Sequence, residues 1–131
     1  MADNLKLSIT IPAKPEDVYS AWLDSKKHSE MTGSEAIVDP KNNGAFTAWD
    51  GYIEGRTIEM EPNTRIVQKW RTTDFHSEDK DSIVEILFES SKNGTKMVLI
   101  HTEIPEGQGD QYKKGWKEFY FDPMKAYFKS E

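Results

Sequence analysis

Three histidines are the first candidates for proton-transfer chemistry in this chain. His101 lies in the alternating stretch TKMVLIHTE (95–103), where it shares one strand face with Glu103. An inward-facing histidine beside a carboxylate could serve as an acid–base pair in a cyclase- or hydrolase-type enzyme. The commoner alternative is a half-buried histidine whose nitrogens are hydrogen-bonded to neighbours. We expect His28 and His76 in helix and loop contexts, at the surface.

Other chemistry is weakly represented. Asp79, Asp81 and Glu78 form an acidic loop that lacks the glycine and the distal glutamate of a calcium loop, so we interpret it as solvated charge. The chain has no cysteine, and therefore no thiolate and no disulfide. No Gly-rich phosphate loop or catalytic triad can be argued from the order of residues. We predict no catalytic residue, no metal and no cofactor.

Aromatic residues gather near the C-terminus, in KKGWKEFYFDPMKAYF (113–128). Together with Tyr112 they recur at steps of three and four, which predicts one apolar helix face. Core packing is the usual role of such a face. The alternative is an incomplete core, with an apolar cavity between this helix and a sheet. The residues we expect to line such a cavity are Phe46, Trp49, Gln68, Trp70, Phe88, Met97, Leu99, His101, Trp116, Phe119 and Tyr120.

The elements that would position these residues are a strand, two short helices, about six strands and one long helix. The segment LKLSITI (5–11) alternates as a half-buried strand does. Pro15 begins a short helix, and Ser25 is expected to cap a second helix that follows it. Strands follow at 35–38, 45–49, 52–60, 65–71, 82–89 and 95–103. Asp50-Gly51 and Asn93-Gly94 predict tight hairpins. Because an antiparallel sheet must cover one apolar face, the long helix is expected to lie across it.

Pro123 interrupts the predicted terminal helix. It lacks a backbone donor and clashes with the carbonyl of Phe119, and it disfavours helical angles at Asp122. Either the helix kinks there, or it stops at Asp122 and a new helix starts with Pro123 at its first position. We favour the kink, because the aromatic stripe keeps its phase across the proline.

The length of the chain and its net charge limit the number of domains and the classes of function to expect. With 131 residues, we expect one domain over 1–131 that forms its own core. The net charge of −6, with no basic stripe, argues against nucleic-acid binding. No apolar run reaches the roughly 18 residues of a membrane span, and the N-terminus lacks signal-peptide features, so we expect a cytoplasmic protein.

Charged residues on the predicted outer strand faces form the last pattern. Glu54, Arg56 and Glu59 precede the basic residues Arg65, Lys69 and Arg71 on the next strand. Cross-strand charge pairs on a solvated face are the simplest interpretation. A charged docking surface for a protein partner is the functional alternative.

The sequence resembles the activator of heat-shock protein 90 ATPase homologue family, within the START-like (SRPBCC, birch-pollen-allergen-like) superfamily. The resemblance is carried by IPAKPEDVYSAWLD (11–24), HSEMTGSEA (28–36), NGAFTAWDGYIEG (43–55), RIVQKWR (65–71) and KKGWKEFYFDPMKAYF (113–128). It implies an α+β helix-grip fold, in which a curved antiparallel sheet is wrapped around a long C-terminal helix. In the eukaryotic co-chaperones of this family, a domain similar to this chain is the second of two domains, so the resemblance implies a relation to that second domain.

Three functions follow, in order of preference. The first is a non-enzymatic START-like domain that binds a small hydrophobic molecule, such as a lipid, in the predicted cavity, as other superfamily members do. The second is a co-chaperone-like module, related to stress response, that contacts a heat-shock protein 90-type chaperone and modulates its ATPase. The third is a cyclase- or hydrolase-type enzyme using His101 and Glu103.

Overall fold

A curved antiparallel sheet dominates the computed structural model, which describes residues 2–129. The strands run in the spatial order β1-β7-β6-β5-β4-β3-β2. Their bounds are β1 (Asp3–Ile11), β2 (Ile37–Val38), β3 (Ala45–Ala48), β4 (Ile53–Glu61), β5 (Arg65–Thr72), β6 (Ser82–Ser91) and β7 (Gly94–Ile104). Among these seven strands, β1 and β7 are neighbours that lie far apart in the sequence. All the other neighbouring strands follow one another directly in the chain.

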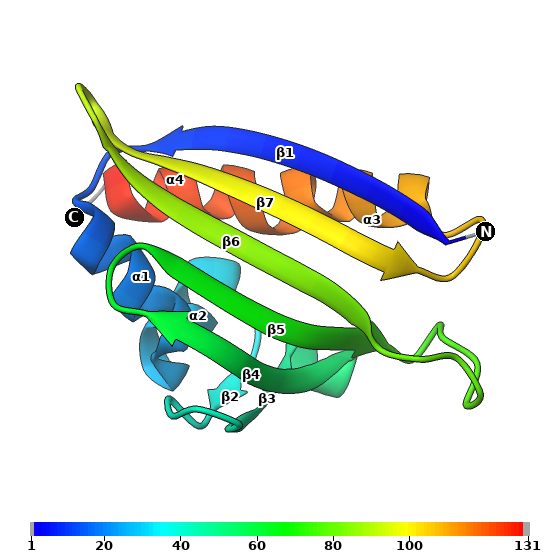
Figure 1. Cartoon of the computed structure of the whole chain (residues 1–131). Coiled ribbons are helices and arrows are strands. Elements are labelled where there is room, and N and C mark those ends of the chain that lie inside the picture. The colour runs from blue at the N-terminus through cyan, green and yellow to red at the C-terminus, as the bar shows by residue number, and fades with distance from the viewer. Residues whose placement is uncertain (1, 130–131) are drawn as a thin grey trace.

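Helices cover one face of this sheet. Figure 1 shows the C-terminal helix running behind β1 and β7, with α1 and α2 packed near one end of the sheet. The helical bounds are α1 (Pro15–Leu23), α2 (Ser25–Thr32), α3 (Gly109–Trp116), the π-helical segment η2 (Lys117–Phe121) and α4 (Asp122–Lys129). Because α3, η2 and α4 follow one another without a break, they act as one long helix. The α+β helix-grip fold predicted from the sequence is thereby confirmed.

The alternating strand pattern predicts the core correctly. Inward positions of the central strands are almost fully buried against the helix: Ile66, Gln68, Trp70, Val84, Ile86, Phe88, Met97, Leu99 and His101. Burial of this much apolar surface is the main stabilising contribution in a domain of this size. The sheet and the long helix therefore share one continuous core.

The alternation fails at one predicted site residue. Glu103 was expected to face inward with His101, but its side chain is exposed. Its φ is +60°, and the pairing of β1 with β7 shifts register beside it, as at a β-bulge. The extra residue returns Ile104, rather than Glu103, to the core. The predicted His101–Glu103 pair is therefore wrong.

The boundary between α1 and α2 differs from the prediction by one residue. Asp24, not Ser25, caps α2, because its carboxylate accepts a 2.8 Å hydrogen bond from the Lys27 amide. The Ser25 hydroxyl instead bonds the amide and carbonyl of Val38, which ties β2 to α2.

Pro123 is accommodated by a π-helical turn. Asp122 keeps helical angles (φ −64°, ψ −47°), so the helix does not stop there, and the alternative of a restart, which we did not favour, is wrong. Its amide donates to the carbonyl of Lys117, five residues earlier, instead of four. The wider turn at η2 displaces the backbone that a proline would otherwise meet in a regular helix. It also lets the adjacent Tyr120 and Phe121 both be buried.

Candidate functional site

A cavity of about 420 Å³ lies between the first half of the long helix and the strands β4 and β5. Its lining residues are Trp49, Tyr52, Ile53, Trp70, Gln111, Tyr112, Gly115, Trp116, Phe119 and Tyr120. The volume falls in the range of pockets that hold small molecules. The cavity sits where the sequence predicted an incomplete core.

Two aromatic walls bound this cavity. In one wall Trp70 packs on Tyr112 and Trp116, with ring centroids 5.1 and 5.3 Å apart. In the other, Trp49 packs edge-on against Phe119 at 5.5 Å. Such ring pairs are favourable contacts, so the aromatic rings within each wall stabilise one another.

Space between the walls depends on Gly115. A β-carbon added at this helical position would meet only Cδ2 of Phe119, at 3.9 Å, and nothing closer. Any larger side chain at this residue would project into the cavity. Phe119, one turn later, remains 52% exposed and borders the solvent side.

A tight turn positions Trp49. The backbone of Trp49, Asp50 and Gly51 has positive φ (52°, 56° and 93°), which is unusual for the first two. Hydrogen bonds to Glu35 hold it, from the Asp50 amide to the Glu35 carbonyl (3.1 Å) and from the Glu35 amide to the Asp50 carboxylate (3.0 Å). The hairpin predicted at Asp50-Gly51 thus exists, with a longer turn than a two-residue loop.

Trp49 lines the cavity, but its polar group is buried. Its indole N–H is buried and has no hydrogen bond of normal geometry within residues 2–129. Burial raises the pKa of Tyr120, and the nearby Trp49 indole offsets part of that rise. A buried donor without a good acceptor is costly to the folded state.

Polar groups line the opposite rim. The Tyr52 hydroxyl and the Gln111 amide nitrogen both donate to Oδ2 of Asp74, the second at 2.8 Å. Burial, followed by the hydrogen bond to Asp74, raises the pKa of Tyr52. The Gln108 amide also donates to the Asp74 carbonyl at 3.1 Å. These bonds fasten the loop after β5 to the start of α3.

His101 is buried in the core, where it belongs to a chain of hydrogen bonds between protein groups. Trp116 donates its indole N–H to Nδ1 (3.0 Å), so Nε2 carries the proton and donates to the Ser82 hydroxyl (2.8 Å). Ser82 in turn donates to the Trp70 carbonyl at 2.6 Å. Burial lowers the pKa of His101 to about 3, which keeps the ring neutral. Both nitrogens are occupied within the core, which fits a structural role.

Gln68 is likewise satisfied inside the core. Its carbonyl oxygen accepts from the Trp22 indole at 3.2 Å, and its amide nitrogen donates to the Thr57 hydroxyl at 3.0 Å. It therefore joins β5 to α1 and β4 rather than facing the cavity.

The predicted cavity residues divide into two groups. Trp49, Trp70, Trp116, Phe119 and Tyr120 line the cavity. The remaining six are buried outside its lining: Phe46, Gln68, Phe88, Met97, Leu99 and His101. Sequence reasoning missed Tyr52, Ile53, Gln111, Tyr112 and Gly115 as lining residues, although Tyr112 belongs to the aromatic stripe. Ligand contact by any of these residues stays a prediction.

His28 does not lie at the surface as predicted. It is buried, with Nδ1 donating to the Trp22 carbonyl (2.8 Å) and Nε2 accepting from the Tyr120 hydroxyl (3.0 Å). Burial lowers the pKa of His28, only partly opposed by the bond to Trp22. The amphipathic pattern of the short α2 was too weak to place it. His76 is exposed, as expected.

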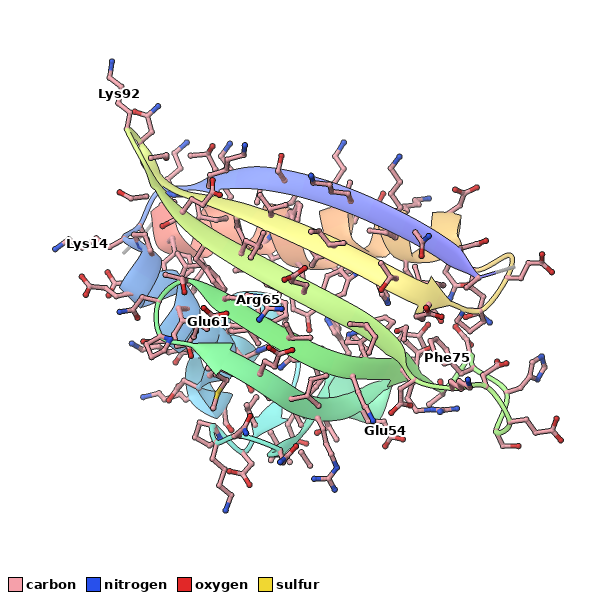
Figure 2. The ribbon with its side chains drawn as sticks, viewed as in Figure 1. Lys14, Glu54, Glu61, Arg65, Phe75 and Lys92 are labelled. Carbon is pink, nitrogen blue, oxygen red and sulfur yellow. The ribbon has the colours of Figure 1, made fainter. Side chains whose placement is uncertain are left out.

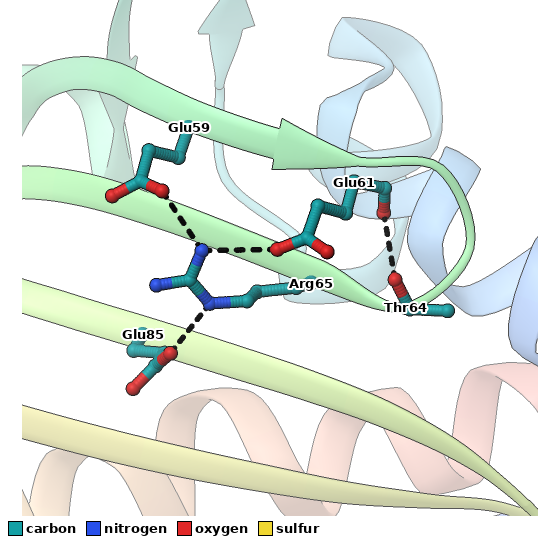
Figure 3. Close-up of polar contacts among 5 residues, drawn as sticks. All are labelled: Glu59, Glu61, Thr64, Arg65 and Glu85. Atoms are coloured by element: carbon teal, nitrogen blue, oxygen red, sulfur yellow. Dashed lines mark hydrogen bonds and ion pairs between the residues drawn. The ribbon is translucent and has the colours of Figure 1, made fainter.

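The outer face of the sheet carries a charge cluster that we call the Arg65 cluster: Glu59, Glu61, Arg65 and Glu85. Figure 3 shows the guanidinium between the three carboxylates. Its nitrogens lie 2.9 Å from Glu59, 3.0 Å from Glu61 and 2.6 Å from Glu85. These bonds, led by the one to Glu85, raise the pKa of Arg65. Three negative charges meet one positive charge, so the cluster is acidic. The predicted cross-strand pairing holds for Glu59 with Arg65.

The acidic loop after β5 is occupied by internal contacts. Asp81 pairs with Arg71 at 2.9 Å, and the Asp79 carboxylate accepts from the His76 amide at 2.8 Å. Across residues 2–129 there is no group of three or more side chains suited to hold a metal ion. Nor does any helix in this part of the chain have the length and apolarity to cross a membrane.

Comparison with known proteins identifies relatives over almost the whole fold. The model of the family "Activator of Hsp90 ATPase homolog 1-like protein" matches residues 12–129. An activator of 90 kDa heat shock protein ATPase homolog from Dictyostelium discoideum is 29% identical over 125 residues, which are 95% of this chain and 32% of that protein. The human homolog 1 is 23% identical over 124 residues, which are 95% of this chain and 36% of that protein.

A solved structure gives the same picture. The crystal structure of an HSP90 activator from Plasmodium falciparum superposes with a TM-score of 0.84 at 28% identity, covering 94% of each chain. The chain spans about a third of the length of the curated relatives that it matches. The family match covers more than half of the chain, and it agrees with the resemblance in the sequence and with the fold. The chain therefore belongs to the activator of Hsp90 ATPase homolog 1-like family.

Proposed function

We propose that this protein contacts an Hsp90-type chaperone and modulates its ATPase. The observation that carries this proposal is the family match over residues 12–129. It is supported by relatives described as activators of the 90 kDa heat shock protein ATPase, and by the solved Plasmodium falciparum chain of similar extent described as an HSP90 activator. In this proposal the protein is a regulator, and the chaperone performs the chemistry.

The Arg65 cluster is the contact surface that we propose for the partner. It lies on the outer face of the sheet, where Figure 2 shows Arg65 and Glu61 on the side that faces the viewer. Glu59 and Glu61 are both exposed. Charged groups of this kind steer association and select partners more than they add affinity. A basic patch on the chaperone is the complementary surface.

Charge reversal tests this surface. The Glu59→Lys/Glu61→Lys variant should weaken binding to the Hsp90-type chaperone of the same host, measured by calorimetry at low salt, by roughly tenfold. Glu78→Lys is the control for a charge reversal away from the cluster, because Glu78 is exposed in the loop at the other end of β5. Equal affinity of the double variant and the control would remove the Arg65 cluster from the proposal. Absence of any binding by the unmodified protein would remove the chaperone function itself.

A second function is favoured by the cavity. We propose that the cavity binds a small, largely apolar molecule, because it has about 420 Å³ of space bounded by aromatic walls. The Gly115→Leu variant fills this space while leaving the helix intact, so a ligand that raises the melting temperature of the unmodified protein should have no effect on it. If the same ligand stabilises both proteins equally, the cavity is not its site.

A further inference from the structure

The cavity lining has an unusual chemical bias. Seven of the ten lining residues are aromatic, and none of the ten carries a charge. The face of an aromatic ring is the negative end of its quadrupole, so rings attract cations and repel anions. A pocket built for a neutral hydrocarbon has no need of this bias, since aliphatic side chains exclude water equally well.

A carboxylate is attached to the rim of the same cavity. Asp74 accepts hydrogen bonds from two lining residues, the Tyr52 hydroxyl and the Gln111 amide nitrogen, both at Oδ2. Both donors are neutral groups, so neither of them offsets a negative charge on Asp74 beside the aromatic wall. No lysine or arginine is among the lining residues to oppose it.

The rest of the molecule acts in the same direction. The net charge of −6 favours the approach of cations and disfavours fatty-acid anions or phosphate esters. An anionic head group would also find no cationic partner in the lining. The aromatic walls, the rim carboxylate and the overall charge agree in sign.

We infer that the cavity binds an apolar organic cation, with a tertiary or quaternary ammonium group held against the aromatic rings near Asp74. The remaining apolar body of the ligand, about the size of one or two rings, fills the space above Gly115. This inference rests on the second proposed function, the binding of a small molecule in the cavity. It goes beyond that function by fixing the charge of the ligand.

Two probe molecules of equal shape isolate the charge. (4-Hydroxyphenyl)trimethylammonium and 4-tert-butylphenol differ by a nitrogen in place of a carbon, and at slightly acidic pH both phenols stay protonated. Titration of the full chain, followed through the NMR signals of its tryptophan indole N–H groups, gives both dissociation constants and locates the site at Trp49, Trp70 and Trp116. The cation should bind roughly fivefold to thirtyfold more tightly than its isostere.

Two variants locate the effect. Asp74→Asn keeps an oxygen acceptor for Tyr52 and Gln111 but removes the charge, so it should weaken cation binding roughly twofold to fivefold and leave isostere binding unchanged. Gly115→Leu should abolish binding of both probes by filling the cavity. Its folded state is verified by the dispersion of its NMR spectrum.

The outcomes distinguish failure of the cation inference from failure of the proposed small-molecule function. If the neutral isostere binds as tightly as the cation, or Asp74→Asn weakens both probes alike, the cavity is a ligand site but the cation inference is overturned. If neither probe shifts the indole signals of the three tryptophans, both the inference and the small-molecule function fail. The chaperone proposal is measured independently, by binding and by ATPase turnover.

Discussion

At the residue scale, His101 shows how burial decides chemistry. Both ring nitrogens are hydrogen-bonded, Nδ1 to Trp116 and Nε2 to Ser82. Because the Trp116 indole can only donate, Nδ1 must accept, and the proton of the neutral ring is on Nε2. Its geometry is that of a buried polar link between the helix and two strands. Glu103, the partner that acid–base chemistry would need, lies on the outside of a bulge.

The buried histidines predict a pH dependence of stability. The pKa of His101 is lowered to about 3, whereas an unfolded histidine titrates near about 6.5. The unfolded chain therefore takes up protons that the folded chain cannot, so stability is lost as the pH falls below about 6.5. Between about pH 7.5 and 5.5, His101 alone should reduce the free energy of unfolding by about 1.4 kcal/mol. His28, whose pKa is also lowered, adds to this loss.

Urea unfolding across this pH range measures the effect. The control is His101→Gln, which keeps hydrogen-bonding groups but does not titrate, and its free energy of unfolding should change less steeply with pH than that of the unmodified protein. Identical pH profiles for the two proteins would contradict a neutral, buried His101.

At the element scale, two glycines should respond to alanine with opposite sign. Gly115 lies in α3 with open space above it. Gly115→Ala should raise the free energy of unfolding by about 0.5 to 1 kcal/mol, because alanine favours the helix and restricts the unfolded chain. The midpoint of urea unfolding is the measurement. A destabilised variant would show that the space above Gly115 is not available.

Gly55 in β4 gives the opposite result. A β-carbon there would stand 1.8 Å from the Lys69 carbonyl oxygen on β5 and 2.8 Å from the Phe46 ring. Backbone cannot withdraw as a flexible side chain can, so Gly55→Ala should cost about 2 kcal/mol or more. The same unfolding experiment compares it directly with Gly115→Ala. Tolerance of alanine at Gly55 would mean that β4 and β5 do not pack as described.

Much of this element order is readable from the sequence. Strand alternation places Ile66, Val84 and Leu99 in the core, and the aromatic period gives the helix face, because both signals average over many residues. What escapes prediction depends on single residues. The bulge at Glu103 changes which side chains face inward, and a π-helical turn absorbs Pro123 without a restart. Neither leaves a periodic signal.

The candidate site is predicted less completely for the same reason. Trp116, Phe119 and Tyr120 follow from the helix period. Tyr52 and Gln111 enter the lining through the turn at Trp49 and the contacts of Asp74, which join segments far apart in the chain. Gly115 contributes by lacking a side chain, and only the packing around it shows the space.

At the scale of the whole molecule, the two faces of the sheet present different chemistry. The inner face and the long helix enclose the aromatic cavity, and the outer face carries the Arg65 cluster. In our account the cavity holds a small molecule while the outer face meets a protein. Because the two sites lie on opposite sides of the sheet, Gly115→Leu should leave chaperone binding unchanged within about twofold. A larger change, measured by calorimetry, would show that the sites are coupled.

The most direct test is the ATPase turnover of the Hsp90-type chaperone of the same host, titrated with this protein to saturation. We predict that turnover changes and that the change saturates as the concentration of this protein rises. The concentration that gives half of the effect should be higher for Glu59→Lys/Glu61→Lys and unchanged for Glu78→Lys. Turnover that stays constant at saturating protein would contradict the account.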